Sequence, residues 1–216
     1  MSSSHVSGTC RQCQKVIAKS QITRHLKACL GPGGDLLVKV ESPHTSYFAF
    51  FTAPRSITLA KMDDVLRGLW LECCGHLSAF VAGGTIYESN PEPDPWLSRR
   101  SRSMNKGLAS VAVPGAAIRY DYDFGSTTEL SVAVVDDAVR GVALKQLAVV
   151  ARNELPTLMC AQCAQPASLL VGWEREPYCQ TCAAALDEEQ KIEVSWPYIN
   201  SPRVGVCGYT GPSIEP

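Results

Sequence analysis

Six of the ten cysteines in this 216-residue chain stand in three Cys-x2-Cys pairs, a spacing typical of zinc ligands. The first pair, Cys10 and Cys13, is followed by His25 and Cys29. A short helix with Ser20 as its N-cap would place His25 and Cys29 on one face, because residues four apart point the same way. We predict a structural zinc ion held by all four side chains, with reduced, unliganded thiols as the alternative. So short a segment has too little apolar content to fold alone, and we expect the metal to supply its fold.

A second set of cysteines near the end of the chain has the spacing of a zinc ribbon. Cys160 and Cys163 are followed, after 15 residues, by Cys179 and Cys182. Disulfides are the weaker alternative, because the N-terminus shows no signal peptide that would direct the chain to an oxidising compartment. We predict a second structural zinc ion here. Four protein ligands at each site leave no open position for water, which a catalytic zinc requires.

The basic residues are concentrated at the N-terminus. Residues 1–34, here called the head, hold five basic side chains and no acidic one, so that the charge is +5 on the head and −6 on the remainder. This asymmetry favours a polyanion as partner of the head, and the alternative is that the charges keep the head soluble or dock it on the acidic remainder. The candidate nucleic-acid contacts are Arg11, Lys15, Lys19, Arg24 and Lys27.

Acidic residues offer a different chemistry in the stretch 120–124. Asp121 and Asp123 alternate with aromatic residues there, so on a strand the two acids would share one face. Together with Glu129 and His76 they could bind Mg²⁺ or Mn²⁺ in a metal-dependent enzyme. We interpret the aromatics as core residues and the acids as hydrated surface groups, and keep the enzyme as an alternative.

Three further cysteines have no metal spacing of their own. Cys73 lies on an apolar helical stripe and is interpreted as a small buried hydrophobe. Cys74 is its direct neighbour, so the two are not expected to share a zinc ion. Cys207 could be a reactive thiol, but the sequence identifies no basic partner for it. His76 is interpreted as a histidine at the core edge that bonds to the backbone.

The remaining pattern predicts the elements that carry these residues. Strands alternate with turn signals on both sides of one apolar helical stripe, which favours an α+β fold with a mainly antiparallel sheet and one long helix. We expect strands at 35–42, 45–52, 76–88, 116–124, 128–135 and 145–153. We further expect a helix at 58–75, a surface loop at 89–107 and a short helix at 183–190. The predicted domains are the head (1–34), an α+β body (35–155) and a zinc ribbon with a Pro/Gly-rich tail (156–216).

Composition limits the class of protein. With 45% hydrophobic and 19% charged residues the chain is an ordinary globular protein, and no apolar run reaches the roughly 20 residues of a membrane span. We expect a soluble, cytoplasmic protein. Phosphate-binding glycine loops, a Ser-His-Asp pattern and an HExxH motif are lacking in the sequence. The prediction is a non-enzymatic zinc protein that binds nucleic acid or a protein, and a protein-interaction adaptor is a further alternative.

Five segments resemble a known family. They are WLECCGHLSAF (70–80), SMNKGL (103–108), YDYDFGSTTEL (120–130), ARNELP (151–156) and NSPRVGVCGY (200–209). These segments are similar to the Ri-plasmid ORF-three-like family, whose members also carry the label of TnpR-type insertion-element passenger proteins. The resemblance covers about residues 35–210 and implies an α+β body and a mobile-element neighbourhood. It implies no reaction, and the sequence holds no serine-recombinase block.

Overall fold

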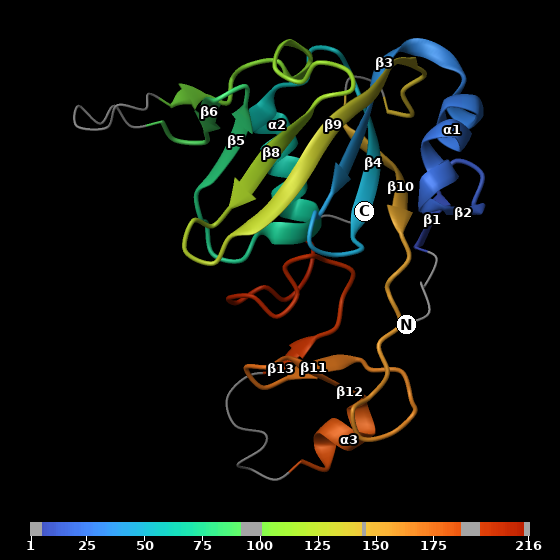
Figure 1. Cartoon of the computed structure of the whole chain (residues 1–216), viewed down its shortest axis with the longest axis vertical. Coiled ribbons are helices and arrows are strands. Elements are labelled where there is room, and N and C mark those ends of the chain that lie inside the picture. Colours follow the sequence, from blue (N-terminus) through green and yellow to red (C-terminus); the bar gives the residue numbers. More distant parts are fainter. Residues whose placement is uncertain (1–5, 92–100, 144–145, 187–194, 214–216) are drawn as a thin grey trace.

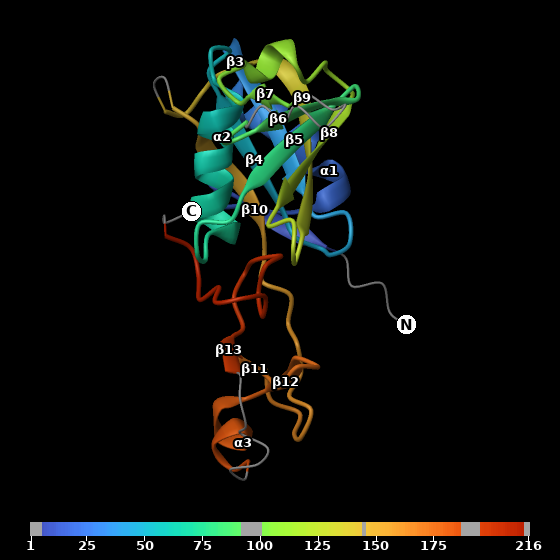
Figure 2. The same cartoon turned by 90° about the vertical axis from the view of Figure 1, so that its left-hand side faces the viewer.

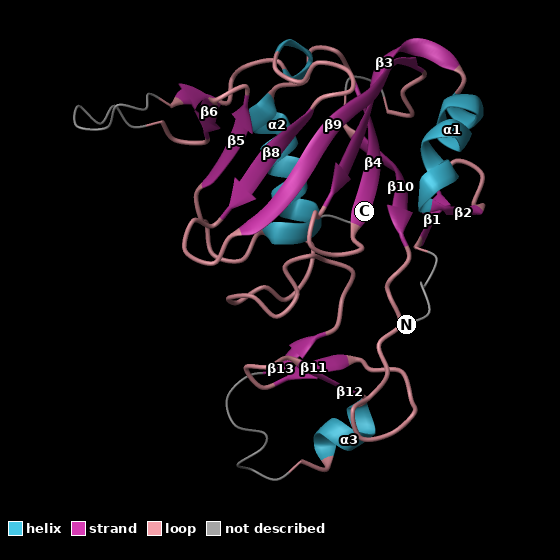
Figure 3. Cartoon of the chain, in the orientation of Figure 1, coloured by secondary structure: helices cyan, strands magenta, loops and turns pink. Residues whose placement is uncertain are grey.

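One large sheet dominates the computed structural model, which describes residues 6–91, 101–143, 146–186 and 195–213. The sheet has ten strands in the order β2-β1-β10-β4-β3-β9-β8-β5-β6-β7 (Figure 1, Figure 3). Neighbouring strands are antiparallel except for β6 and β7. The strands are β1 (Ser7–Cys10), β2 (Val16–Ala18), β3 (Pro32–Glu41), β4 (Phe48–Ala53), β5 (Ser78–Ala82), β6 (Thr85–Glu88), β7 (Arg102–Ser103), β8 (Ala117–Tyr122), β9 (Thr128–Val139) and β10 (Ala148–Asn153). The predicted α+β class with a mainly antiparallel sheet is confirmed.

The helices are short, so the expectation of one long helix is wrong. Helix α2 has eight residues and passes into a π-helical turn of five. The backbone becomes extended at Glu72, with ψ 123°, and the chain therefore leaves the helix three residues before Gly75. The helical elements are α1 (Lys19–Leu30), α2 (Leu59–Leu66), the π-helical turn (Arg67–Leu71), a 3-10 turn (Leu108–Ser110) and α3 (Gln180–Ala184).

Helices α1 and α2 lie on opposite sides of the sheet, as Figure 2 shows. The central strand β4 reads FAFFTA, and all six of its residues are buried. Phe51 belongs to the cluster under α2, whereas Phe48 and Phe50 belong to the cluster under α1. A continuous apolar run is what a strand covered on both faces requires.

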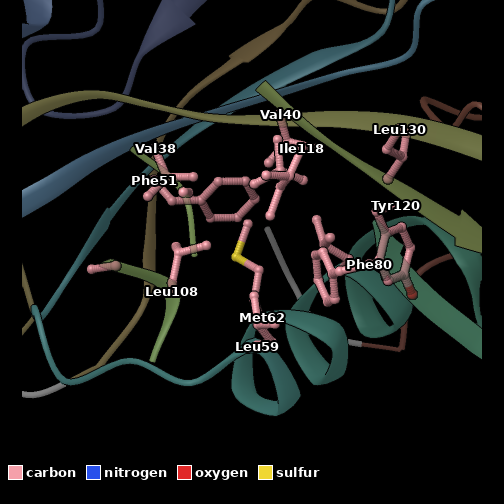
Figure 4. Close-up of a cluster of buried hydrophobic side chains, with 14 of the residues drawn as sticks. Val38, Val40, Phe51, Leu59, Met62, Phe80, Leu108, Ile118, Tyr120 and Leu130 are labelled. Atoms are coloured by element: carbon pink, nitrogen blue, oxygen red, sulfur yellow. The ribbon is translucent and has the colours of Figure 1, made fainter. Parts of the chain in front are cut away.

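The larger core lies between α2 and the sheet (Figure 4). Thr58 caps the helix, because its Oγ1 accepts a hydrogen bond of 3.2 Å from the backbone N–H of Lys61. The apolar stripe then places Leu59, Met62 and Leu66 against the strands, and all three are fully buried. The helix predicted from the periodicity of this part of the sequence is therefore confirmed up to the π-helical turn.

The head shares the large sheet with the body. Strand β1 pairs with β10, and its partner β2 forms the edge of the sheet. Helix α1 buries Ile22, Leu26 and Leu30 against that end of the sheet. The helix begins after Ala18 without a side-chain cap, so the prediction of Ser20 as N-cap is wrong by two residues.

The ribbon forms a separate, smaller unit beyond one end of the large sheet (Figure 1). Its three strands have the order β12-β11-β13 and are antiparallel. They are β11 (Leu169–Val171), β12 (Glu176–Tyr178) and β13 (Ser195–Pro197). Residues 92–100 of the predicted surface loop and residues 187–190 of the predicted helix lie outside the described residues.

The C-terminal segment, residues 198–213, returns from the ribbon to the body. The Ser201 hydroxyl donates a 2.7 Å hydrogen bond to the Trp70 carbonyl, and the backbone N–H of Ser213 donates one of 2.8 Å to the Gly68 carbonyl. Tyr209 is only 1% exposed. The segment is irregular, yet it is held against the end of the π-helical turn.

Candidate metal centres

The head cluster joins the β1–β2 turn to helix α1. Cys10 ends β1 and Cys13 lies in the turn, while His25 and Cys29 stand one turn apart on the helix. The Cys13 Sγ is 3.3 Å from the His25 Nε2, and the Cys10 Sγ is 4.0 Å from the Cys29 Sγ. All four ligand atoms lie within 4.8 Å of one another, so these residues could hold a metal ion.

The ribbon cluster joins the loop of Cys160 and Cys163 to the start of helix α3. The Cys163 Sγ lies 3.7 Å from that of Cys179 and 3.6 Å from that of Cys182. Cys179 also caps α3, because its sulfur accepts a hydrogen bond from the backbone N–H of Cys182. Cys160 completes the group, whose ligand atoms again lie within 4.8 Å of one another.

A third cluster was missed by the sequence analysis. Cys73, Cys74 and His76 follow the π-helical turn, and Cys207 reaches them from the C-terminal segment. The Cys74 Sγ lies 3.0 Å from the His76 Nε2, 3.5 Å from the Cys207 Sγ and 3.7 Å from the Cys73 Sγ. This third group therefore also has four donors that could hold a metal ion.

Several sequence interpretations are corrected by this cluster. Cys73 does pack against the main core, but its sulfur also faces the cluster. Cys74, its neighbour, joins the same group, and His76 faces Cys207 at 3.6 Å rather than a backbone carbonyl. The adjacent pair and the Cys-x-His spacing were the available signals, but nothing local connects them to Cys207, which lies 131 positions beyond His76.

The three clusters share the dimensions of a closed tetrahedral zinc site. Zinc–sulfur bonds of about 2.3 Å at tetrahedral angles separate two sulfurs by about 3.8 Å, and a sulfur from a nitrogen by about 3.5 Å. Five of the sulfur pairs in the three clusters are 3.5–4.0 Å apart, and within each cluster all ligand atoms lie within 4.8 Å of one another. All ten cysteines of the chain belong to one of these clusters.

One thiol in each cluster is biased towards the thiolate, the form that binds metal. A hydrogen bond with the backbone of Lys15 lowers the pKa of Cys13. Although desolvation raises it, the pKa of Cys160 is lowered to about 6 by backbone N–H groups around its sulfur. A hydrogen bond with His76 lowers the pKa of Cys207 to about 7.

The predicted acidic face is divided by the structure. Asp121 pairs with Arg119 at 3.0 Å and faces Glu129 across β8 and β9. Asp123 has a positive φ of 63° and leaves the strand alternation. It is 6% exposed and forms a 2.6 Å ion pair with Arg203, so the expectation that it is hydrated is wrong.

This separation bears on the enzyme alternative. Desolvation raises the pKa of Asp121, whereas for Asp123 desolvation is outweighed by the Arg203 hydrogen bond, which lowers the pKa. Within the described residues, no group of three metal-ligating side chains includes Asp121, Asp123 or Glu129.

The basic residues of the head divide into two groups. Lys19 forms an ion pair with Glu41 at 2.8 Å, and Lys27 forms one with Asp136 at 2.6 Å. These two ion pairs therefore connect the head to the body, an arrangement that fits the alternative in which the charges face the acidic remainder of the chain. Within the described part of the chain, Arg11, Lys15 and Arg24 form no ion pair.

A cleft lies beside the head cluster, where β1 and β10 end. Arg152 lies on one wall with its guanidinium carbon 5.6 Å from the centre of the Trp70 ring. Its Nη2 donates to the Asn200 carbonyl, but its buried Nε has no partner within the described residues. Burial lowers the pKa of Arg152 to about 10. The lining residues are Thr9, Arg11, Gln14, Arg152, Asn153, Glu154 and Asn200.

Comparisons with known proteins give little to add. No family profile and no curated protein sequence matches the chain. One solved structure, a protein of unknown function, MM3350, from Methanosarcina mazei Go1, is similar at 13% identity and a TM-score of 0.44. The match covers 53% of this chain and 67% of that one. Among the described residues, no helix is long and apolar enough to cross a membrane.

Proposed function

We propose that this chain is a non-enzymatic zinc-binding protein with one structural zinc ion in the head and one in the ribbon. Each of these clusters offers four protein donors, which fill a tetrahedral zinc and leave no position for water or substrate. Thiolates with imidazole favour zinc over magnesium or calcium, which take oxygen ligands. In the head the metal would tie the β1–β2 turn to α1, and in the ribbon it would tie the loop of Cys160 and Cys163 to the start of α3.

Metal analysis of the reduced, purified protein tests this proposal. We expect at least two zinc ions per chain, lost in the matched variants Cys13→Ser and Cys163→Ser one at a time. Because the two clusters are built from separate segments, each variant should keep the zinc of the other cluster. Zinc near zero, with all thiols open to alkylation, would contradict the proposal.

We further propose that the partner is a nucleic acid, bound through its phosphates at the cleft beside the head cluster. The observation that carries this proposal is Arg152, whose Nε is buried without a partner among the described residues. Arg11 lines the same cleft. Neither guanidinium forms an ion pair among the described residues, although Glu154 also lines the cleft. Two such groups favour an anion, and phosphate matches their planar donors.

Salt-dependent binding to a short DNA duplex tests the partner. With Arg11, Lys15, Arg24 and Arg152 reaching at most four phosphates, the log–log salt slope should be about −3 to −4, with a dissociation constant of about 10⁻⁴–10⁻⁶ M. Arg11→Gln should reduce the slope by about 0.9. The control Lys61→Gln removes an exposed charge on α2 that pairs with Asp64, and it should leave binding unchanged.

Point variants suit this test better than removal of the head, because β1 forms backbone pairs with β10 and its loss would open the sheet. Absence of binding at low salt would overturn the nucleic-acid proposal and favour the protein-interaction adaptor. The zinc proposal would stand in that case, because its readout is the metal content.

The enzyme alternative depends on Asp121, Asp123 and Glu129. The ion pair between Asp123 and Arg203 speaks against it, because it commits one of the three carboxylates. Titration with Mn²⁺ followed by calorimetry should therefore find no saturable oxygen-ligand site. A micromolar site abolished by Asp121→Asn would revive the enzyme. Membership of the Ri-plasmid ORF-three-like family and a mobile-element neighbourhood remain proposals that rest on the sequence resemblance.

A further inference from the structure

We propose that Cys73, Cys74, His76 and Cys207 form a third zinc centre, which fastens the C-terminal segment to the body. This centre differs in kind from the head and ribbon clusters. Their ligands lie within single short stretches, whereas Cys207 stands 131 positions beyond His76. The zinc would therefore join two distant parts of the chain instead of building a local module.

The backbone at 72–76 explains how neighbouring cysteines can serve one metal. The helix ends at Leu71, and Gly75 then turns the chain with a φ of 77°. The Glu72 carboxylate fixes this turn by accepting hydrogen bonds from the Gly75 N–H at 2.6 Å and the Tyr122 hydroxyl at 3.2 Å. The sulfurs of Cys73 and Cys74 end up 3.7 Å apart, close to the edge of about 3.8 Å in a zinc tetrahedron.

A carboxylate lies near the second nitrogen of His76, where zinc-bound histidines usually have a hydrogen-bond partner. Its Nε2 faces the sulfurs of Cys74 and Cys207, while its Nδ1 lies 3.5 Å from an Asp123 carboxylate oxygen. A carboxylate on the far nitrogen fixes the tautomer and the ring orientation of a ligating histidine. Asp123 is held in turn by the Gly125 N–H at 3.0 Å. This arrangement gives the unusual backbone of Asp123 a purpose as a positioning residue.

Arg203 supplies positive charge behind the sulfurs. It is fully buried, and its Nη2 donates to Asp123 at 2.6 Å and to the Cys73 Sγ at 3.6 Å. Its guanidinium also lies over the Tyr122 ring, 4.8 Å from the centroid. Three thiolates and one neutral imidazole around Zn²⁺ carry one net negative charge, and a buried cation beside it compensates that charge. Arg203 and Cys207 both belong to the C-terminal segment. That segment therefore supplies both a metal ligand and the compensating positive charge.

A disulfide between Cys74 and Cys207 is the competing occupant, since their sulfurs are 3.5 Å apart. A disulfide would use two of the four donors and leave Cys73 and the imidazole of His76 without a role. The convergence of a third thiol, the imidazole nitrogen and the Asp123 carboxylate favours the metal. Because the C-terminal segment is irregular, such a centre would fix the position at which it meets the body.

The zinc content of the wild-type chain and of Cys207→Ser, purified under reducing conditions without chelator, tests the proposal. We expect one zinc ion fewer in the variant, whatever the occupancy of the other two clusters. Leu77→Ser is the matched control, because Leu77 lies between the ligand His76 and Ser78 with its side chain 54% exposed. It should keep the full zinc content. Equal zinc in wild type and Cys207→Ser would overturn the proposal.

Two measurements on soluble protein cover the case that Cys207→Ser does not fold. Cys74 and Cys207 are exposed, yet in the wild type both should resist alkylation until a chelator removes the metal. Rapid alkylation without chelator would overturn the proposal, as would an intact mass showing a Cys74–Cys207 disulfide in the native protein. Asp123→Asn should release one zinc ion to a competing chelator about 10–100-fold more readily, while the other zinc ions are unaffected. Unchanged release would remove Asp123 from the centre.

Discussion

The head and the ribbon have similar metal ligands but very different support from the rest of the molecule. In the head, α1 buries Ile22, Leu26 and Leu30 in a core shared with the large sheet. In the ribbon, the buried cluster consists of Cys160, Val171 and Tyr178, and α3 has no buried residue. A metal with four ligands would therefore add to an existing core in the head, whereas in the ribbon the metal and its ligands would form most of the core.

Because of this difference, loss of the metal should affect the fold of the ribbon more than that of the head. The expectation that zinc alone supplies the fold of the head does not fit a segment whose strand β1 pairs with β10. It does fit the ribbon, whose three-stranded sheet offers little apolar area to offset the entropy of ordering the chain. Small units of that kind generally depend on a metal or a disulfide.

The largest expected effect follows from loss of the ribbon metal. Cys179→Ser removes one ligand, whereas the serine hydroxyl can still cap α3 in place of the sulfur. Loss of the metal alone should therefore unfold the ribbon, while the body stays folded. A structural zinc contributes on the order of 10 kcal/mol in small domains. Limited proteolysis with mass spectrometry should locate new cleavage sites within residues 160–186. Unchanged protease resistance there would mean that the fold of the ribbon does not depend on its metal.

A smaller effect is expected in the head. Cys29→Ser should abolish the head metal, but α1 should remain docked, because Leu26 and its neighbours stay buried. Leu26→Ala is the complementary variant, which keeps all four ligands and creates a cavity at a cost of about 2–5 kcal/mol. Amide hydrogen exchange across α1 separates the two. We expect Leu26→Ala to accelerate exchange more than Cys29→Ser does.

The reverse order would show that the head depends on its metal as the ribbon does. In that case the shared sheet and the apolar face of α1 would be insufficient to hold the helix, and the difference between the two regions would disappear.

The sequence was informative where a pattern is local. Strand alternation and the helical stripe located most elements, and two of the three clusters follow from spacing alone. The end of the helix near Glu72 could not be predicted, because the π-helical turn continues an apolar stripe without a breaking residue. The alternating sequence pattern also gives no indication that Asp123 has a positive φ.

The contacts that escaped prediction are those between distant parts of the chain. Cys207 lies near His76, and Arg203 near Asp123, because the irregular C-terminal segment folds back on the body. Periodicity describes one element at a time and carries no information on such a return path. His76 was therefore assigned to a structural role, and Cys207 was given no partner.

The smallest expected effect concerns one of the two ion pairs that join the head to the body. Lys27 Nζ lies 2.6 Å from a carboxylate oxygen of Asp136, with 46% of the lysine side chain exposed. Exposed pairs of this kind contribute roughly 0–1 kcal/mol, so Lys27→Gln should barely change the free energy of unfolding. If the apolar face of α1 holds the head in place, loss of this ion pair should cost little free energy of unfolding. A loss of several kcal/mol would mean that charge, and not burial, docks the helix.

The pKa of Asp136 gives the same variant a second and more sensitive readout. The hydrogen bond from Lys27 lowers this pKa, so the pair stabilises the folded state above the ordinary aspartate value of about 3.9. That contribution is lost as the pH falls through the lower pKa of the folded state. In Lys27→Gln the pKa should rise towards its ordinary value, although the backbone N–H of Ala138 still donates to the carboxylate. An NMR titration of the Asp136 carboxyl carbon measures this shift, and Lys61→Gln should leave it unchanged. A pKa that does not move in Lys27→Gln would mean that the pair is not formed in solution, which would leave the apolar face of α1 as the main contact between head and body.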